Sequence, residues 1–153
     1  MVDYKIIPHG DIQKTLRISF DGLDENAKNI FLDIACFFNG NDVEYVTKIL
    51  DSTHGFHSYS GIEELKDRCL VTQSYNKSLK MHNLIQEMGK EIVRQESPNE
   101  PGKRSRLWFH EDIRDVLERD TVKLPFIFTF IFIFYFFYPK LSYKKNIELF
   151  FFA

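Results

Sequence analysis

His82 is the residue of this chain best placed to contact a charged ligand, because it stands just before an apolar, helix-spaced run. His82 is the second residue of the stretch MHNLIQEMG, residues 81–89, and directly precedes a predicted helix. Free backbone N–H groups and the positive end of the helix dipole meet there, so an anion is favoured. An imidazole N–H can donate a hydrogen bond to such an anion. The alternative is a partly exposed histidine that flanks a helix cap and binds nothing.

The other residues with reactive side chains form no catalytic or metal-binding set. Cys36 and Cys69 lie among apolar residues, which predicts reduced, buried thiols in a cytosolic or nuclear protein rather than a disulfide. His54 and His57 share one loop, yet a metal pair there has no third ligand nearby. The sequence has no nucleophile–base pair, carboxylate pair or G-x-x-x-x-G-K-S/T phosphate loop. We therefore expect neither an enzyme nor a metal site.

The helix after His82 has clear start and packing signals. Asn83 is a good N-cap, and Gln86 three residues later completes a capping-box pattern. Gly89 in mid-helix costs about 1 kcal/mol against Ala, which indicates close contact with a neighbouring element. The predicted apolar face comprises Leu84, Ile85, Met88, Ile92 and Val93.

A helix over residues 24–40 is the strongest signal in the chain. Asp24 caps its start and Gly40 marks its end. Its apolar positions follow helical spacing and predict a broad buried stripe. They are Ala27, Ile30, Phe31, Ile34, Ala35 and Phe38.

Three further helices are predicted before His82. The first covers residues 12–20, with Asp11 as N-cap. The next covers residues 42–50 and is capped by Asn41 or Asp42. The last begins near Gly61, with Ser60 and Glu63 at capping-box spacing and with an inner face of Ile62, Leu65 and Cys69.

The periodicity changes after residue 69. LVTQSY and SLKMH are strand-like pieces joined by a polar turn, which predicts an antiparallel hairpin. Helices followed by such a hairpin predict a mainly α fold, a winged-helix domain with the hairpin as its wing. Residues 97–102 break the pattern, and KRSRLW at 103–108 is a basic cluster. A last helix is expected at 111–119, with Ile113, Val116 and Leu117 facing inward.

The charge distribution bears on DNA binding, the rival function for a stand-alone winged helix. Residues 1–120 carry 16 of the 20 Lys and Arg but 21 of the 22 Asp and Glu, which argues against a nucleic-acid partner. Acids outnumber bases in both candidate recognition helices, the one at 42–50 and the one from Gly61. KRSRLW would serve as a basic arm in the DNA-binding interpretation, and as a solvated turn or interdomain contact otherwise.

Residues 122–153 differ in composition from the rest of the chain. Phe, Ile, Tyr, Lys and Asn dominate this hydrophobic tail, all with AT-rich codons, and Val122-Lys123 can be encoded as a splice donor read in frame. We therefore hypothesise that the tail is translated intron. Its apolar run at 124–138 is shorter than the roughly 20 residues of a spanning helix. A genuine membrane hairpin or anchor is the alternative.

Several motifs in fixed order resemble a known family. They are LRISFDGLDENAKNIFLDIACFFNG, GIEELKDRCLV, MHNLIQEMGKEIVRQESPNEPGKRSRLW and HEDIRDVLERDT. Over residues 4–121 the chain resembles plant intracellular disease resistance proteins with a Toll/interleukin-receptor-like domain, a nucleotide-binding (NB-ARC) switch and leucine-rich repeats. The resemblance implies a truncated fragment: residues 1–10 from the preceding helical subdomain, 11–96 as the winged-helix domain, and 97–121 as a linker with a basic turn and a short helix.

The same resemblance implies a role for His82 in defence signalling. MHN is similar to the family's Met-His-Asp motif, whose histidine reaches the β-phosphate of bound ADP and helps hold the closed, inactive state. Asn83 replaces the motif's Asp here, which removes a carboxylate that the closed state can use. The implied ligands are ADP and ATP, bound only in an intact receptor. The implied partners are that receptor's own nucleotide-binding and leucine-rich-repeat domains, in the cytoplasm or nucleus.

Overall fold

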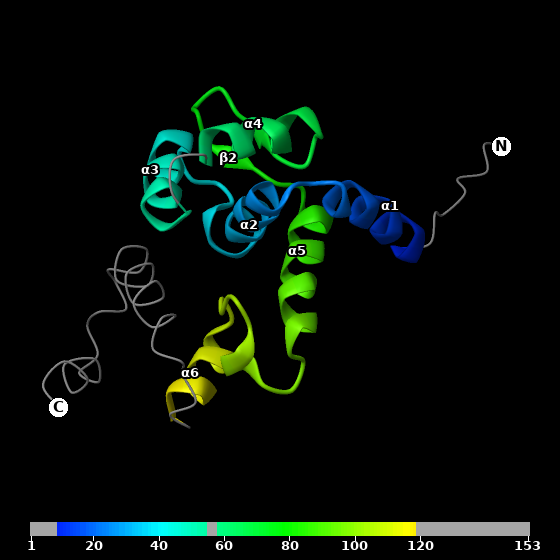
Figure 1. Cartoon of the computed structure of the whole chain (residues 1–153), viewed down its shortest axis with the longest axis vertical. Coiled ribbons are helices and arrows are strands. Elements are labelled where there is room, and N and C mark those ends of the chain that lie inside the picture. Colours follow the sequence, from blue (N-terminus) through cyan, green and yellow to red (C-terminus); the bar gives the residue numbers. More distant parts are fainter. Residues whose placement is uncertain (1–8, 55–57, 119–153) are drawn as a thin grey trace, which may run out of the picture.

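The computed structural model describes residues 9–54 and 58–118, which form a helical body with a small hairpin (Figure 1). In chain order the elements are α1 (His9–Asp21), α2 (Glu25–Asp33), the π-helical turn η1 (Ile34–Phe38), α3 (Val43–His54), α4 (Ser58–Asp67), β1 (Thr72–Gln73), β2 (Leu79–Lys80), α5 (Asn83–Glu96), the 3-10 turn η2 (Pro101–Lys103) and α6 (His110–Glu118). The predicted mainly α, winged-helix arrangement is confirmed. The hydrophobic tail, residues 122–153, lies outside the described residues. The intron hypothesis and the membrane alternative both concern this tail and stay predictions. Among the described helices, none is long and apolar enough to cross a membrane.

The core is built around α2 and η1, which continues it. Oδ1 of Asp24 accepts a hydrogen bond from the Ala27 N–H at 2.7 Å, so the predicted N-cap is confirmed. All six positions of the predicted stripe are buried. The π-helical geometry of η1 was not predicted. It joins residues five apart and leaves the last turn wider than an α-helical one. Gly40 follows with a φ of +93°, a conformation that glycine adopts readily.

The wing is a short antiparallel hairpin, as predicted. Its register places Thr72 opposite Lys80 and Gln73 opposite Leu79. The backbone also ties the wing to the end of η1. The Gly40 N–H donates to the Leu79 carbonyl at 2.7 Å, and the Leu79 N–H donates to the Asn41 carbonyl at 2.8 Å. The segment that follows β2, which carries His82, therefore starts from a fixed position against the core.

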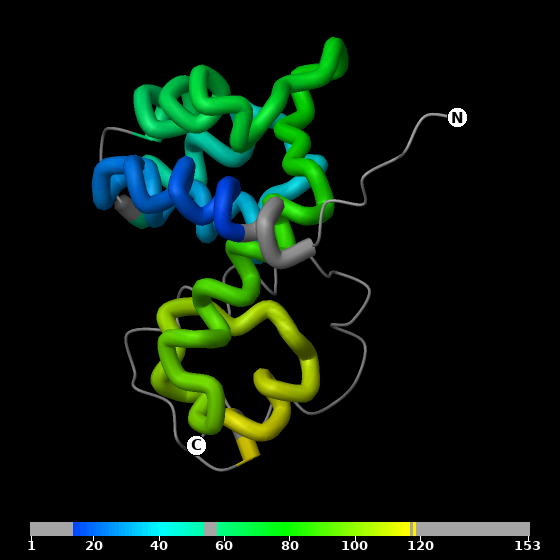
Figure 2. The backbone as a smooth tube through the Cα atoms, turned by 90° about the vertical axis from the view of Figure 1, so that its right-hand side faces the viewer, coloured from blue at the N-terminus to red at the C-terminus, as the bar shows by residue number. Residues whose placement is uncertain are grey.

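The helix α5 crosses the core at close range. A Cβ atom added to Gly89 would lie 2.6 Å from Cβ of Ala35 and 3.1 Å from Cε1 of Phe31. The close contact predicted for this glycine is confirmed. Figure 2 shows α5 continuing from the helical body down to residues 97–118, which form the lower part of the molecule.

The predicted starts of α1 and α4 are wrong. The backbone is already helical at His9, so Asp11 lies inside the first turn of α1. An acidic residue in a first turn also faces the positive end of the helix dipole, so its sequence signal does not distinguish it from a cap. The helix α4 begins at Ser58, which places Ser60 inside it. Ser58 is buried and its hydroxyl donates to the Thr47 carbonyl of α3 at 3.3 Å, a tertiary contact that local spacing does not reveal.

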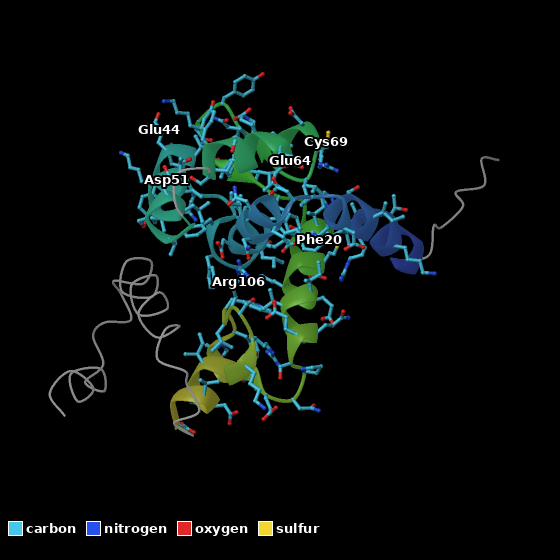
Figure 3. All side chains as sticks on the ribbon, viewed as in Figure 1. Phe20, Glu44, Asp51, Glu64, Cys69 and Arg106 are labelled. Atoms are coloured by element: carbon cyan, nitrogen blue, oxygen red, sulfur yellow. The ribbon has the colours of Figure 1, made fainter. Side chains whose placement is uncertain are left out.

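Cys69 is exposed, so its predicted place on the inner face of α4 is wrong. It lies beyond the end of α4 with a φ of +57°. The Leu70 N–H donates to the Leu65 carbonyl and the Cys69 N–H to the Lys66 carbonyl, each at 2.9 Å. This is the Schellman pattern, in which a left-handed residue ends the helix. Figure 3 shows Cys69 at the outer edge of the molecule.

Candidate functional site

His82 is the N-cap of α5, which corrects the prediction that Asn83 has this role. Its backbone is extended, with φ −61° and ψ 142°, and its Nδ1 accepts a hydrogen bond from the Leu84 N–H at 3.2 Å. Its carbonyl accepts from the N–H groups of Ile85 and Gln86, both at 2.9 Å. The side chain is exposed. The histidine that local reasoning left outside the helix is the residue that starts it.

The cap determines which nitrogen of His82 is available to a ligand. A neutral imidazole has one N–H donor and one bare acceptor nitrogen. Because Nδ1 accepts from Leu84, the hydrogen of the neutral ring is on Nε2. The exposed side chain therefore offers an N–H donor to solvent at the end of α5 where backbone N–H groups favour an anion.

Asn83 is the first residue of α5 and is exposed. Asp and Asn are equivalent caps, but this position does not cap the helix. The difference between Asn83 and the motif's Asp is therefore a difference of charge, and the start of α5 does not depend on it.

Gln86 does not complete the predicted capping box but points inward. Its Nε2 donates to the Ala35 carbonyl of η1 at 2.9 Å. Its Oε1 accepts from Nδ2 of Asn39 at 3.0 Å. The capping-box prediction failed because helix numbering was off by one residue, so Gln86 lies one place deeper in α5 than that motif requires.

Asn39 is a site residue that sequence reasoning missed. It follows η1, and its Oδ1 accepts from the Met81 N–H at 2.9 Å, directly before His82. A polar residue between the apolar stripe and Gly40 was the available signal. Such a residue ordinarily indicates only the end of a helix, and the contact spans 42 positions of the chain.

Arg104 and Arg106 of the basic cluster KRSRLW are buried, so the solvated-turn alternative is wrong for these two residues. The interdomain-contact alternative stays a prediction. Arg106 is 9% exposed, and its Nε donates to Oδ1 of Asp33 at 2.5 Å. Its Nη2 donates to the Asn29 carbonyl at 3.0 Å. Figure 3 shows Arg106 between α2 and the lower segment. A guanidinium can be buried when carboxylate and carbonyl oxygens surround it.

Arg104 organises the segment that follows α5. It is 5% exposed, and its guanidinium donates to the carbonyls of Ser97 and Pro98 and to Oδ2 of Asp112, each at 2.8 Å. Asp112 belongs to α6, so one side chain joins the turn after α5 to the last helix. Val116 of α6 is buried, as predicted. Residues 97–118 thus form a structured extension of the domain.

The candidate DNA-recognition helices expose acidic side chains. Glu44 and Asp51 are exposed on the outer side of α3 (Figure 3). On α4, Asp67 is exposed and Glu64 is half-buried. The cation of α4 and the one just after it are already paired, Lys66 with Glu63 at 2.8 Å and Arg68 with Glu64 at 3.0 Å. These surfaces offer little to a phosphate backbone.

Of His54 and His57, the structure describes only the first. His54 is the last residue of α3, and His57 lies outside the described residues. Within residues 9–54 and 58–118, no three His, Cys, Asp or Glu side chains are grouped to hold a metal ion.

Known proteins similar to this chain are plant resistance proteins. Residues 24–97 match the family described as disease resistance protein Roq1-like, winged-helix domain. Disease resistance proteins RUN1 and RPV1 of Vitis rotundifolia are 52% and 50% identical over 101 and 113 residues, 66% and 74% of this chain. The TMV resistance protein N of Nicotiana glutinosa is 42% identical over 106 residues, 69% of this chain. The chain spans only 7%, 8% and 9% of these relatives' lengths.

The fold and the match over residues 24–97 define a winged-helix domain. The chain belongs to the family of plant disease resistance proteins of the Toll/interleukin-receptor, nucleotide-binding and leucine-rich-repeat class, as its motifs indicated.

Proposed function

We propose that this domain is the winged-helix module of an ADP/ATP-dependent switch in a plant immune receptor, and that His82 binds the β-phosphate of ADP. The observation that carries the proposal is the cap geometry. Because Nδ1 of His82 accepts from Leu84, the exposed Nε2–H can donate to a phosphate oxygen. The N-terminus of α5 adds a favourable dipole for the anion.

The proposed contact acts on a conformational equilibrium. A ligand shifts a two-state equilibrium only by its difference in affinity between the two states. A phosphate contact made by His82 in the closed arrangement alone therefore favours that arrangement while ADP is bound. Its loss shifts the population toward the open arrangement. The nucleotide-binding and leucine-rich-repeat domains of the receptor are the partners in this rearrangement.

The rest of the nucleotide site lies on other domains in this proposal. The sequence contains no G-x-x-x-x-G-K-S/T loop to hold phosphates. One histidine at a helix start provides little affinity alone. We expect residues 1–121, purified by themselves, to show no saturable ADP binding in calorimetry. If residues 1–121 alone bound ADP with micromolar affinity, the phosphate-binding part of the site could not be assigned to another domain.

The test of the proposal is ADP release from an intact receptor carrying this module. His82→Ala removes both the cap and the phosphate donor, whereas His82→Ser restores a good N-cap but is too short to reach a phosphate. We expect both variants to release ADP about tenfold faster, the usual cost of losing one hydrogen bond to a charged group. His110→Ala is the matched control, because His110 is also an exposed histidine that begins a helix. Unchanged release in both His82 variants would contradict the proposal.

DNA binding remains the alternative function. The exposed acids of α3 and α4 weigh against it. A gel shift at low salt separates the two proposals, since tight, salt-sensitive binding would support the DNA-binding function.

A further inference from the structure

A chain of hydrogen bonds links the backbone before His82 to the core helix. The Met81 N–H donates to Oδ1 of Asn39 at 2.9 Å. Nδ2 of Asn39 donates to Oε1 of Gln86 at 3.0 Å. Nε2 of Gln86 then donates to the Ala35 carbonyl at 2.9 Å. The amide chain, as we call these three bonds, joins η1 to both sides of His82.

The direction of the amide chain is fixed at its two ends by backbone groups. The Met81 N–H can only donate, so the oxygen of the Asn39 amide must face it. The Ala35 carbonyl can only accept, so the nitrogen of the Gln86 amide must face that end. Between them, the Asn39 nitrogen meets the Gln86 oxygen. Neither amide can be reversed without losing a bond to the backbone.

The Ala35 carbonyl accepts from Gln86 because the end of η1 leaves it exposed to other donors. The last carbonyls of any helix lack partners within it. Gly40, five residues beyond Ala35, directs its N–H to the Leu79 carbonyl of the wing at 2.7 Å instead. The Gly40 N–H is therefore not available to the Ala35 carbonyl, and the side chain of Gln86 donates to that carbonyl instead.

We propose that Asn39 is a positioning residue for His82. It bonds to both backbone groups of Met81, the residue directly before His82. Its Oδ1 accepts from the Met81 N–H, and its Nδ2 lies 3.4 Å from the Met81 carbonyl oxygen. Through Gln86 it also holds the first turn of α5 after His82. This inference rests on the proposed function, because it explains how an exposed histidine keeps the orientation that a phosphate contact needs.

The local cap alone is a weak device for that purpose. Its hydrogen bond is 3.2 Å long, joins neutral groups and lies at the surface. Met81, in contrast, is only 5% exposed, so the bonds that Asn39 makes to it are part-buried. The backbone of His82 is therefore oriented from the protein interior, and its ring is free to contact a ligand.

Amide hydrogen exchange on the full chain tests the inference without any nucleotide. In Asn39→Ala we expect exchange at Leu84 and Ile85 to accelerate about tenfold more than at Val46 of α3. Leu84 and Ile85 bond to His82 and not to Asn39, so a change there reports the orientation of His82. Uniform acceleration at all three amides would mean general destabilisation and would overturn the proposal.

Asn41→Ala is the matched control for the exchange experiment. Asn41 is two positions from Asn39, and its bonds to Phe38 and Leu79 are made by backbone atoms that alanine retains. We expect no selective change at Leu84 or Ile85 in this variant. If Asn39→Ala does not fold, Asn39→Asp carries the test, since it keeps the acceptor for the Met81 N–H and loses the donor for Gln86. Selective acceleration at Leu84 and Ile85 is expected there too, and its absence would contradict the proposal.

A double-mutant comparison in an intact receptor connects positioning to function. If Asn39 acts through His82, Asn39→Ala accelerates ADP release in the wild-type background and not in the His82→Ala background. Equal acceleration in both backgrounds would overturn the positioning role. If His82→Ala alone leaves release unchanged, the proposed function fails, and the exchange experiment still decides the role of Asn39.

Discussion

Two attachments join later parts of the chain to the same core helix, and they use different chemistry. The amide chain binds the region around His82 to Ala35 through neutral groups. The ion pair of Arg106 binds the segment after α5 to Asp33, two residues earlier. The first attachment is directional and lies beside an exposed side chain. The second is charged and buried, and it links the segment after α5 to α2.

The difference indicates what each attachment contributes. Breaking one partner of a buried ion pair leaves a charge without compensation, so that attachment is costly to lose. A chain of neutral amides costs less to break, but its donor and acceptor directions specify orientation. The buried ion pair therefore contributes mainly to the stability of the attached segment. The amide chain contributes mainly to the orientation of the backbone around His82.

Removing one partner of the ion pair should have the largest effect. Arg106→Ala leaves Asp33 buried without its cation, and we expect the free energy of unfolding to fall by about 3–5 kcal/mol. Urea denaturation measures this. Lys103→Ala is the control, because the Lys103–Glu100 pair has side chains 63% and 60% exposed and should contribute less than about 1 kcal/mol. Equal losses in the two variants would contradict the comparison.

Filling the contact at Gly89 should have the next largest effect. Alanine favours helices by about 1 kcal/mol over glycine, but the added Cβ would lie 2.6 Å from Cβ of Ala35. We expect Gly89→Ala to destabilise the fold by about 1–3 kcal/mol, as measured by thermal or urea unfolding. Glu87→Ala, at an exposed position of the same helix, serves as the control. A gain in stability from Gly89→Ala would show that α5 is not held close to η1.

The cap of α5 should contribute a smaller amount, separable from its function. His82→Ala should lower the free energy of unfolding by about 0.5–1 kcal/mol, whereas His82→Ser should not lower it, because serine is a good N-cap. Urea unfolding of the two variants measures the difference. If both variants lose equal stability, the cap bond to Leu84 is not what His82 contributes to the fold.

The two thiols should differ in reactivity without a stability effect at neutral pH. Burial raises the pKa of the Cys36 thiol from 9.0 to about 12, and nearby Arg106 only partly opposes this. A thiol attacks as its thiolate, so alkylation followed by mass spectrometry should modify exposed Cys69 and spare Cys36 until the protein unfolds. Between pH 9 and 12 the unfolded chain loses the Cys36 proton and the folded protein keeps it. Stability should therefore fall with rising pH across that window. Cys36 is partly buried and Cys69 is exposed, so equal labelling of both thiols in the folded protein would contradict this difference.

Elements with strong local signals could be predicted from the sequence. The stripe from Ala27 to Phe38, the Asp24 cap and the wing all follow from periodicity and short-range chemistry, and the structure confirms them. Gly89 was informative for the same reason, because a glycine in mid-helix is unfavourable unless something packs against it.

Features that depend on distant partners could not be predicted. Asn39 meets residues 42 and 47 positions away, and Arg106 meets a residue 73 positions away. A lone asparagine and a basic cluster carry no signal of those contacts. The start of α5 was misplaced by one residue because Asn83 is a better cap than histidine by local rules, while the amide chain fixes the helix start from the core. The misplaced residue is His82, which has the proposed function and is the N-cap of α5.

The most direct test of this account is the protonation of the His82 ring, read by nitrogen-15 NMR on the full chain in mildly alkaline solution. The cap to Leu84 predicts that the hydrogen is on Nε2 and that Nδ1 is a bare acceptor coupled to the Leu84 N–H. His82→Ser identifies the signals by their disappearance. A ring that carries its hydrogen on Nδ1 would contradict the account, because that ring can neither cap α5 nor offer Nε2–H to a phosphate.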